Sequence, residues 1–170
     1  MKTVQECLQR FRELGRDSYV AEHDHPFLLF PETHGKSNFT SAHTQMADRD
    51  SDPSVSGSTK RISEFRVLAP PAGEGRKWLV GRSEDRELNI DHSTVSKRHA
   101  FIVFDPENHS FKMGDSGSTN GTYLNGHLIE SGEAVFVRDG NILSFGDCDY
   151  LFYGPEAFAD LLERLSEENA

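Results

Sequence analysis

The strongest constraint on the fold is a series of short β-type runs between residues 62 and 153, separated by turn residues about every 8–12 positions. The runs include KWLVG, HAFIVF, AVFV and YLFY. Two of the separators, Asn125-Gly126 and Asp139-Gly140, are typical of type I′ hairpin turns, which need positive φ at both central residues. About ten or eleven short strands with no helix between them predict an all-β sandwich or barrel.

The residues before this region predict a helical arm. Apolar residues between Val4 and Leu14 follow helical spacing, and Gly15 is a plausible end of that helix. A short apolar run, Pro26 to Phe30, follows. An isolated helix of about 13 residues is marginal in water, so the arm must either dock on something or fray. The sequence leaves open whether its partner is the main domain or another protein.

A polar segment separates this arm from the β-rich region. Residues 33–60 contain ten Ser or Thr and only five apolar side chains, which predicts a flexible linker because so little surface can be buried. After the last strand, Pro155 and a stripe of apolar residues from Phe158 to Leu165 predict a short helix. We therefore divide the chain into an arm (1–32), a linker (33–60), a β-domain (61–154) and a C-terminal helix (155–170).

Charge and composition exclude some classes of function. The chain has 18 Lys and Arg against 28 Asp and Glu, for a net charge of −10, which argues against nucleic acid as a partner. No run approaches the roughly 18 apolar residues of a membrane span. The two cysteines, Cys7 and Cys148, are interpreted as buried thiols of a reducing compartment. We expect a cytoplasmic protein that binds neither nucleic acid nor membrane.

The unusual polar signals of the β-region all lie between strands. Gly81-Arg82 closes the second strand, Ser96 to His99 precedes the strand AFIVF, and Gly117 to Gly121 precedes TYLNG. A sandwich that gathers these loops at one end is suited to binding an anion. Arginine offers a planar fork of donors to phosphate oxygens, and hydroxyl and backbone N–H groups add neutral donors.

In order, the elements G-R, I-D-H-S-T-V-S-K-R-H-A and G-S-T-N-G-T-Y-L-N-G resemble the forkhead-associated (FHA) domain. The resemblance covers about residues 61–154, a little over half of the chain. It implies a β-sandwich of about eleven strands, of the SMAD/FHA type, whose loops at one end bind phosphothreonine peptides. In this chain an N-terminal helical arm and a short C-terminal helix would flank the sandwich.

The resemblance also implies roles for five residues of a phosphopeptide site. Arg82 would hold the phosphate, and Ser96 would donate its hydroxyl to it. Lys97 would add a second positive charge, and Thr119 would lie beside the phosphate. Asn120 would hydrogen-bond the main chain of the peptide and so set its register.

Three further residues would be structural in this pattern. Gly81 and Gly121 would occupy tight backbone positions, and the imidazole of His99 would tie the loops together. The resemblance therefore separates residues that touch the peptide from residues that hold the loops in place.

The functional prediction is a non-enzymatic module that recognises phosphothreonine in Ser/Thr-kinase signalling, without a cofactor or a metal. Its partner would be a phosphothreonine-containing protein or peptide, namely a Ser/Thr kinase or its substrate. One alternative is a phosphate-independent interaction scaffold, in which Arg82 is dispensable.

Two enzyme or metal interpretations have weaker support. A small hydrolase could use Ser96 and His99, with Asp91 or Asp115 as a third member, but no nucleophile-elbow motif surrounds Ser96. The triplet His23-Asp24-His25 could ligate a metal, but no further ligands follow at the spacing of a metal site. We therefore expect neither a catalytic residue nor a metal ligand in this chain.

Overall fold

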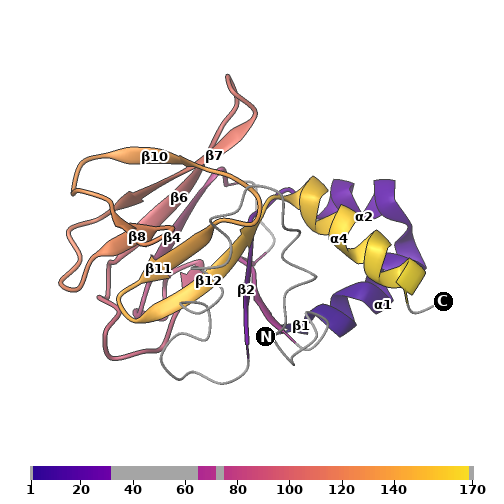
Figure 1. Cartoon of the computed structure of the whole chain (residues 1–170), viewed down its shortest axis with the longest axis horizontal. Coiled ribbons are helices and arrows are strands. Elements are labelled where there is room, and N and C mark those ends of the chain that lie inside the picture. Colours follow the sequence, from indigo (N-terminus) through magenta and orange to yellow (C-terminus); the bar gives the residue numbers. More distant parts are fainter. Residues whose placement is uncertain (1, 32–64, 72–74, 169–170) are drawn as a thin grey trace.

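The computed structural model describes residues 2–31, 65–71 and 75–168, and two β-sheets packed face to face dominate it (Figure 1). The first sheet has the strand order β1 (Lys2–Thr3), β3 (Arg66–Leu68), β2 (Phe27–Phe30), β12 (Cys148–Tyr153), β11 (Ile142–Phe145), β8 (Thr122–Leu124), β9 (His127–Leu128). The second has the order β10 (Ala134–Val137), β7 (Ser110–Asp115), β6 (Ala100–Asp105), β4 (Lys77–Gly81), β5 (Leu88–Asn89). Neighbouring strands are antiparallel except for β4 and β5. The predicted β-sandwich is confirmed.

Three helices gather at one end of the sandwich, on the right in Figure 1. They are α1 (Val4–Leu14), α2 (Arg16–Glu22) and α4 (Pro155–Glu168). Helix α1 begins with a capping box, in which the Thr3 hydroxyl accepts from Glu6 N–H at 3.2 Å and the Glu6 carboxylate accepts from Thr3 N–H at 2.7 Å. An ion pair of 2.6 Å between Arg16 and Asp160 joins α2 to α4.

Two hydrophobic cores explain why some strands are apolar at every position. In β2, Leu28 and Phe30 face the core between the two sheets, whereas Phe27 and Leu29 face the helices. Strand β12 alternates between the two cores in the same way. Both strands are therefore buried on both faces, and this explains their continuous runs FLLF and YLFY.

The position of β2 resolves the question that the sequence leaves open about the arm. Residues 27–30 form a strand between β3 and β12, with Leu28 opposite Leu68 and also opposite Phe152. The N-terminal residues thus dock on the main domain of the same chain. The segment predicted as a linker, 33–60, lies outside the described residues, and the division of the chain into four parts stays a prediction.

None of the helices in the described segments is long and apolar enough to cross a membrane.

Candidate functional site

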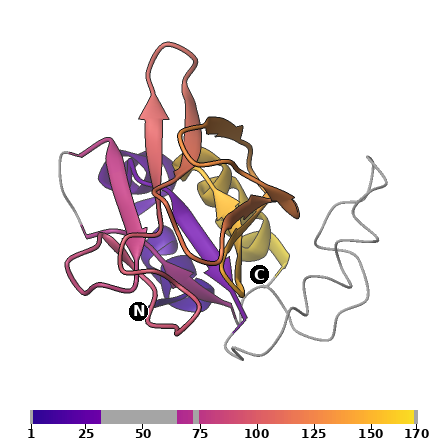
Figure 2. The same ribbon diagram turned by 90° about the vertical axis from the view of Figure 1, so that its left-hand side faces the viewer.

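The three loops that carry the predicted site residues meet at the end of the sandwich away from the helices. Figure 2 views the molecule from that end. The first loop follows β4 at Gly81, the second precedes β6 at Ala100, and the third connects β7 to β8 through residues 116–121. Hydrogen bonds between the loops then define how closely the predicted residues approach one another.

The first two loops are in direct backbone contact. Arg82 N–H donates to the Ser96 carbonyl at 2.9 Å. A side chain on Gly81 would place its Cβ 2.2 Å from the Lys97 carbonyl oxygen, a distance that no such pair tolerates. The absence of a side chain at Gly81 therefore allows Arg82 to lie beside Ser96 and Lys97.

Asn89 on β5 holds the Arg82 loop from the other side. Its side-chain amide donates to the carbonyls of Arg82 at 3.1 Å and Ser83 at 3.0 Å. A buried or half-buried carbonyl without such a partner would be costly, so this amide stabilises one conformation of the loop. Asn89 thus positions the backbone that carries the Arg82 guanidinium.

The imidazole of His99 connects the second loop to the third. His99 is fully buried, and its Nδ1 accepts from Ser96 N–H at 3.0 Å, which leaves Nε2 to donate to the Gly121 carbonyl at 2.9 Å. Burial lowers the pKa of His99 below its usual value, which favours this neutral form. Since both ring nitrogens bind backbone groups, His99 is not placed to take a proton from the Ser96 hydroxyl, and the hydrolase interpretation loses its base.

The third loop is organised by Asp115 at the end of β7. One carboxylate oxygen accepts from Gly117 N–H at 2.8 Å and Ser118 N–H at 3.0 Å, and the other accepts from the hydroxyls of Ser118 and Thr122. Burial alone would raise the pKa of Asp115, but these hydrogen bonds outweigh it and hold the pKa below its usual value. The chain also turns at Gly121 with φ of +89°, where glycine is favoured.

Two of the predicted contact residues also connect the loops. The Ser96 hydroxyl oxygen accepts from Thr119 N–H at 3.0 Å, so its hydrogen remains available to donate outward. The Asn120 side-chain amide donates to the Thr94 carbonyl at 2.8 Å, and within the described residues its Oδ1 accepts no hydrogen bond. Ser96, Thr119 and Asn120 therefore lie together, each with polar capacity left for a ligand.

Three exposed cations lie in the loops at this end of the sandwich. Arg82, Lys97 and Arg98 are exposed, and none of them forms an ion pair with another described residue. Asp85 lies in the same group of loops, and its pKa is lowered by a Ser83 hydrogen bond and by the charges of Arg86 and Arg98. Exposed cations without an acidic partner attract an anion over roughly the Debye length of about 8 Å.

The structure brings all eight predicted positions to this end of the sandwich, five as candidate contacts and three within the loop backbone. Sequence reasoning did not assign a positioning role to Asn89, Thr94 or Asp115. The sequence D-S-G-S around Asp115 is a recognisable Asx-turn pattern, so that residue had a detectable signal. Asn89 and Thr94 had no such signal in the local sequence, because the groups with which they form hydrogen bonds lie in other loops.

A separate cavity lies elsewhere in the molecule. It has a volume of about 850 Å³ and is lined by residues such as Phe104, Arg138 and Pro155, at the end where the helices pack. None of the predicted site residues lines it. Among residues 2–31, 65–71 and 75–168, no group of three or more His, Cys, Asp or Glu side chains is placed to hold a metal ion.

The segment that carries these loops is similar to known proteins. The model of the FHA domain family matches residues 78–146. The chain is 45% identical over 125 residues to the glycogen accumulation regulator GarA of Mycobacterium tuberculosis. The matched segments cover 64% of this chain and 74% of GarA. The chain is also 30% identical over 97 residues to an ABC transporter ATP-binding/permease protein of Mycobacterium tuberculosis. That match covers only 10% of the length of the transporter protein.

A solved structure from a study of phosphothreonine-dependent FHA domain interactions is also similar. Its sequence is 24% identical to this chain, and the superposition has a TM-score of 0.43. The match covers 51% of this chain and 82% of the chain in the solved structure. The family model includes Arg82, Ser96, His99 and Asn120, and the GarA match extends over most of that relative. From this sequence similarity we conclude that the chain belongs to the FHA domain family.

Proposed function

We propose that the chain is a phosphothreonine-peptide recognition module that mediates phosphorylation-dependent protein–protein interaction. Arg82 and Lys97 supply positive charge to the phosphate. Ser96, through its hydroxyl, and Thr119 lie beside the phosphate and supply polar groups at short range. Asn120 binds the main chain of the peptide. The observation that carries the proposal is the convergence of these five residues on loops that His99 and Asp115 hold in one arrangement.

The family supports the class of ligand. The solved FHA structure described above comes from work on phosphothreonine-dependent interactions, and the GarA relative is named as a regulator. We infer a regulatory, non-enzymatic role in which the output comes from the bound partner, a Ser/Thr kinase or a substrate of one. No cofactor or metal enters the proposal.

The cysteines support a cytoplasmic location for the module. Cys7 and Cys148 are buried and form no disulfide, and burial raises the pKa of the Cys148 thiol to about 11. Unpaired buried thiols of this kind fit a reducing compartment.

Calorimetry with a phosphothreonine peptide and its unphosphorylated counterpart tests the proposal. Two or three charge-assisted hydrogen bonds, less the cost of ordering the peptide, predict micromolar affinity for the phosphorylated form. Arg82→Ala should weaken binding at least about 30-fold, which corresponds to about 2 kcal/mol. Arg82→Lys should recover only part of the loss, because lysine lacks the planar fork of donors.

The matched control is Arg138→Ala, which removes an exposed arginine from the opposite end of the sandwich. It removes one positive charge, as Arg82→Ala does, and should leave affinity within about twofold. Equal binding of both peptides, together with normal binding by Arg82→Ala, would support the phosphate-independent scaffold instead.

A further inference from the structure

A shallow hollow lies directly beside the proposed phosphopeptide site. Its volume is about 490 Å³, and one wall is the loop that carries Thr119 and Asn120. The other wall is formed by Tyr123 on β8, Leu128 on β9 and Glu130 in the connection to β10. Because Thr119 and Asn120 border both regions, a peptide bound through Asn120 lies within a few residues of the hollow.

The wall formed by Tyr123 and Leu128 is apolar and is held in place. Leu128 and Tyr123 pack closely against the Gly121 turn, and the Tyr123 hydroxyl donates to the Asn120 carbonyl at 3.2 Å. Leu128 is nevertheless 59% exposed. The other exposed large apolar side chain of the described residues, Phe136 at 48%, has the Lys112 ammonium 4.6 Å from its ring.

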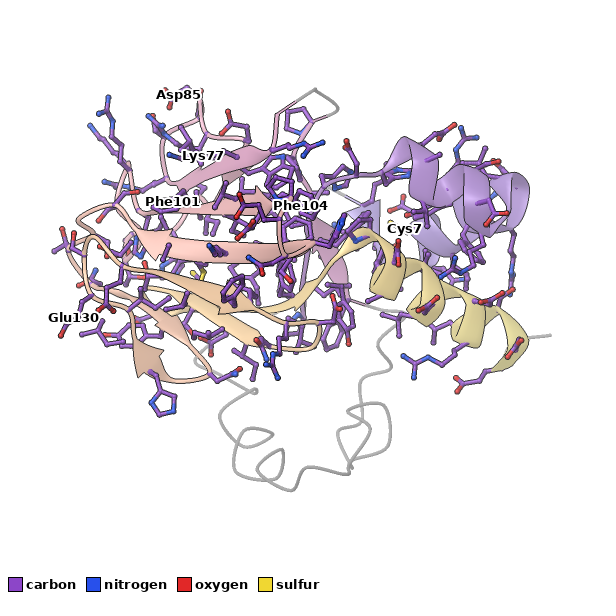
Figure 3. The ribbon with its side chains drawn as sticks, turned by 90° about the horizontal axis from the view of Figure 1, so that it is seen from above. Cys7, Lys77, Asp85, Phe101, Phe104 and Glu130 are labelled. Carbon is purple, nitrogen blue, oxygen red and sulfur yellow. The ribbon has the colours of Figure 1, made fainter. Side chains whose placement is uncertain are left out.

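The rim of the hollow is acidic. Glu130 is exposed and forms no ion pair with another described residue. Figure 3 shows Glu130 at the loop end of the sandwich, on the side opposite Asp85. Arg98, one of the three exposed cations, is close enough to Asp85 to lower the pKa of that carboxyl, whereas Glu130 is on the other side of this end.

We propose that this hollow is a second subsite for the same peptide and selects a lysine or arginine near the phosphothreonine. The aliphatic stem of that side chain lies on Leu128 and Tyr123, and its charged end meets Glu130. The inference rests on the proposed function, since it places the phosphate at Arg82. It adds the chemical class of the target, a phosphothreonine segment with a basic residue a few positions away.

Calorimetry with a set of alanine-based phosphothreonine peptides tests this subsite. One lysine is moved through each position on both sides of the phosphothreonine, and an all-alanine phosphopeptide is the reference. We expect lysine at one position to raise affinity about threefold and at most about fivefold, the range of a solvent-exposed ion pair. Norleucine at that position should keep a smaller gain, because it retains only the apolar contact.

Three variants assign the gain to the hollow. Glu130→Gln should abolish the advantage of the lysine peptide over the norleucine peptide. Glu130→Lys should reverse the charge preference, so that a peptide with glutamate at that position binds more tightly than the lysine peptide. Leu128→Ser should reduce the gain from both lysine and norleucine. Glu133→Gln is the matched control, since Glu133 is an exposed acid of the same connection that does not line the hollow.

The outcomes separate this inference from the proposed function. If the all-alanine phosphopeptide does not bind, the proposed function fails. If it binds in an Arg82-dependent way but lysine gives no Glu130-dependent gain at any position, the subsite is wrong and the phosphate site stands. A gain that also disappears in Glu133→Gln would show only a diffuse charge effect and would equally overturn the subsite.

Discussion

The two ends of this molecule are both well packed, but apolar contacts hold the helix end together and buried hydrogen bonds hold the loop end. At the helix end, the buried residues that join α1 and α4 to the sheet are almost all apolar, including Leu8, Phe27 and Phe158. At the loop end, His99, Asp115 and Thr122 are buried and polar, and each is hydrogen-bonded to the loops. Apolar burial is non-directional, whereas buried hydrogen bonds require one geometry. The helix end therefore mainly supplies stability, and the loop end mainly supplies position.

The largest expected effect comes from the helix end. Phe158 is fully buried and stacks on Phe27 with ring centroids 4.2 Å apart. Phe158→Ala should lower the free energy of unfolding by about 3–5 kcal/mol, measured by urea titration. Phosphopeptide affinity should stay unchanged wherever the variant is folded.

Phe158→Leu is the milder companion, with an expected loss of less than about 1.5 kcal/mol. A tenfold loss of affinity in either folded variant would break the comparison, because the helix end would then also position the site.

The next effect should come from Asp115, and it should reach both stability and binding. Asp115→Asn replaces an acceptor of four hydrogen bonds by a group that also presents donors to N–H and O–H groups. We expect a loss of about 2 kcal/mol in unfolding free energy at pH 7 and a weaker phosphopeptide affinity.

The Asp115 effect should depend on pH. Because the folded pKa of Asp115 is lowered, its stabilising contribution is present above the unfolded pKa and is lost as pH falls through the folded value. The stabilities of wild type and Asp115→Asn should thus begin to converge as pH falls below about 4, the unfolded pKa of an aspartate. A constant difference down to pH 3 would contradict this assignment.

A smaller effect, on the pH dependence of stability, should come from the buried histidine at each end of the molecule. Burial lowers the pKa of both His99 and His25, so each contributes stability that is present above about pH 6.5 and is lost as pH falls through its folded pKa. Unfolding free energy should fall below pH 6.5 by less than about 1.4 kcal/mol per pH unit for each histidine. The slope should decrease in His99→Asn and separately in His25→Asn.

Phosphopeptide affinity should respond to His99→Asn and not to His25→Asn, when both are measured at pH 7.5. The same affinity loss in both variants would mean that the two ends of the molecule are coupled.

The smallest effect should come from Arg16→Gln. The ion pair between Arg16 and Asp160 is short, but both side chains are exposed. Exposed pairs contribute little and are screened by salt. We expect a barely measurable change in thermal midpoint at low salt and none at 0.5 M salt; a larger change would mean that helix docking depends on this pair.

The sequence predicted the β-sandwich, the helices α1 and α4 and the loops that carry Arg82, Ser96 and Asn120, but it did not predict α2. The predicted features are encoded locally. Turn pairs such as Asn125-Gly126 depend on neighbouring dihedral angles, and helix periodicity depends on residues three or four apart.

The tertiary structure decided where β2 lies and how the loops are fastened. Residues 27–30 pair with β3 and with β12, more than a hundred residues away, because a strand that is apolar on both faces is stable only between two cores. The contacts of Asn120 with Thr94 and of His99 with Gly121 likewise join residues distant in sequence. Such partners are chosen by burial and hydrogen bonding across the whole folded chain, which no local pattern records.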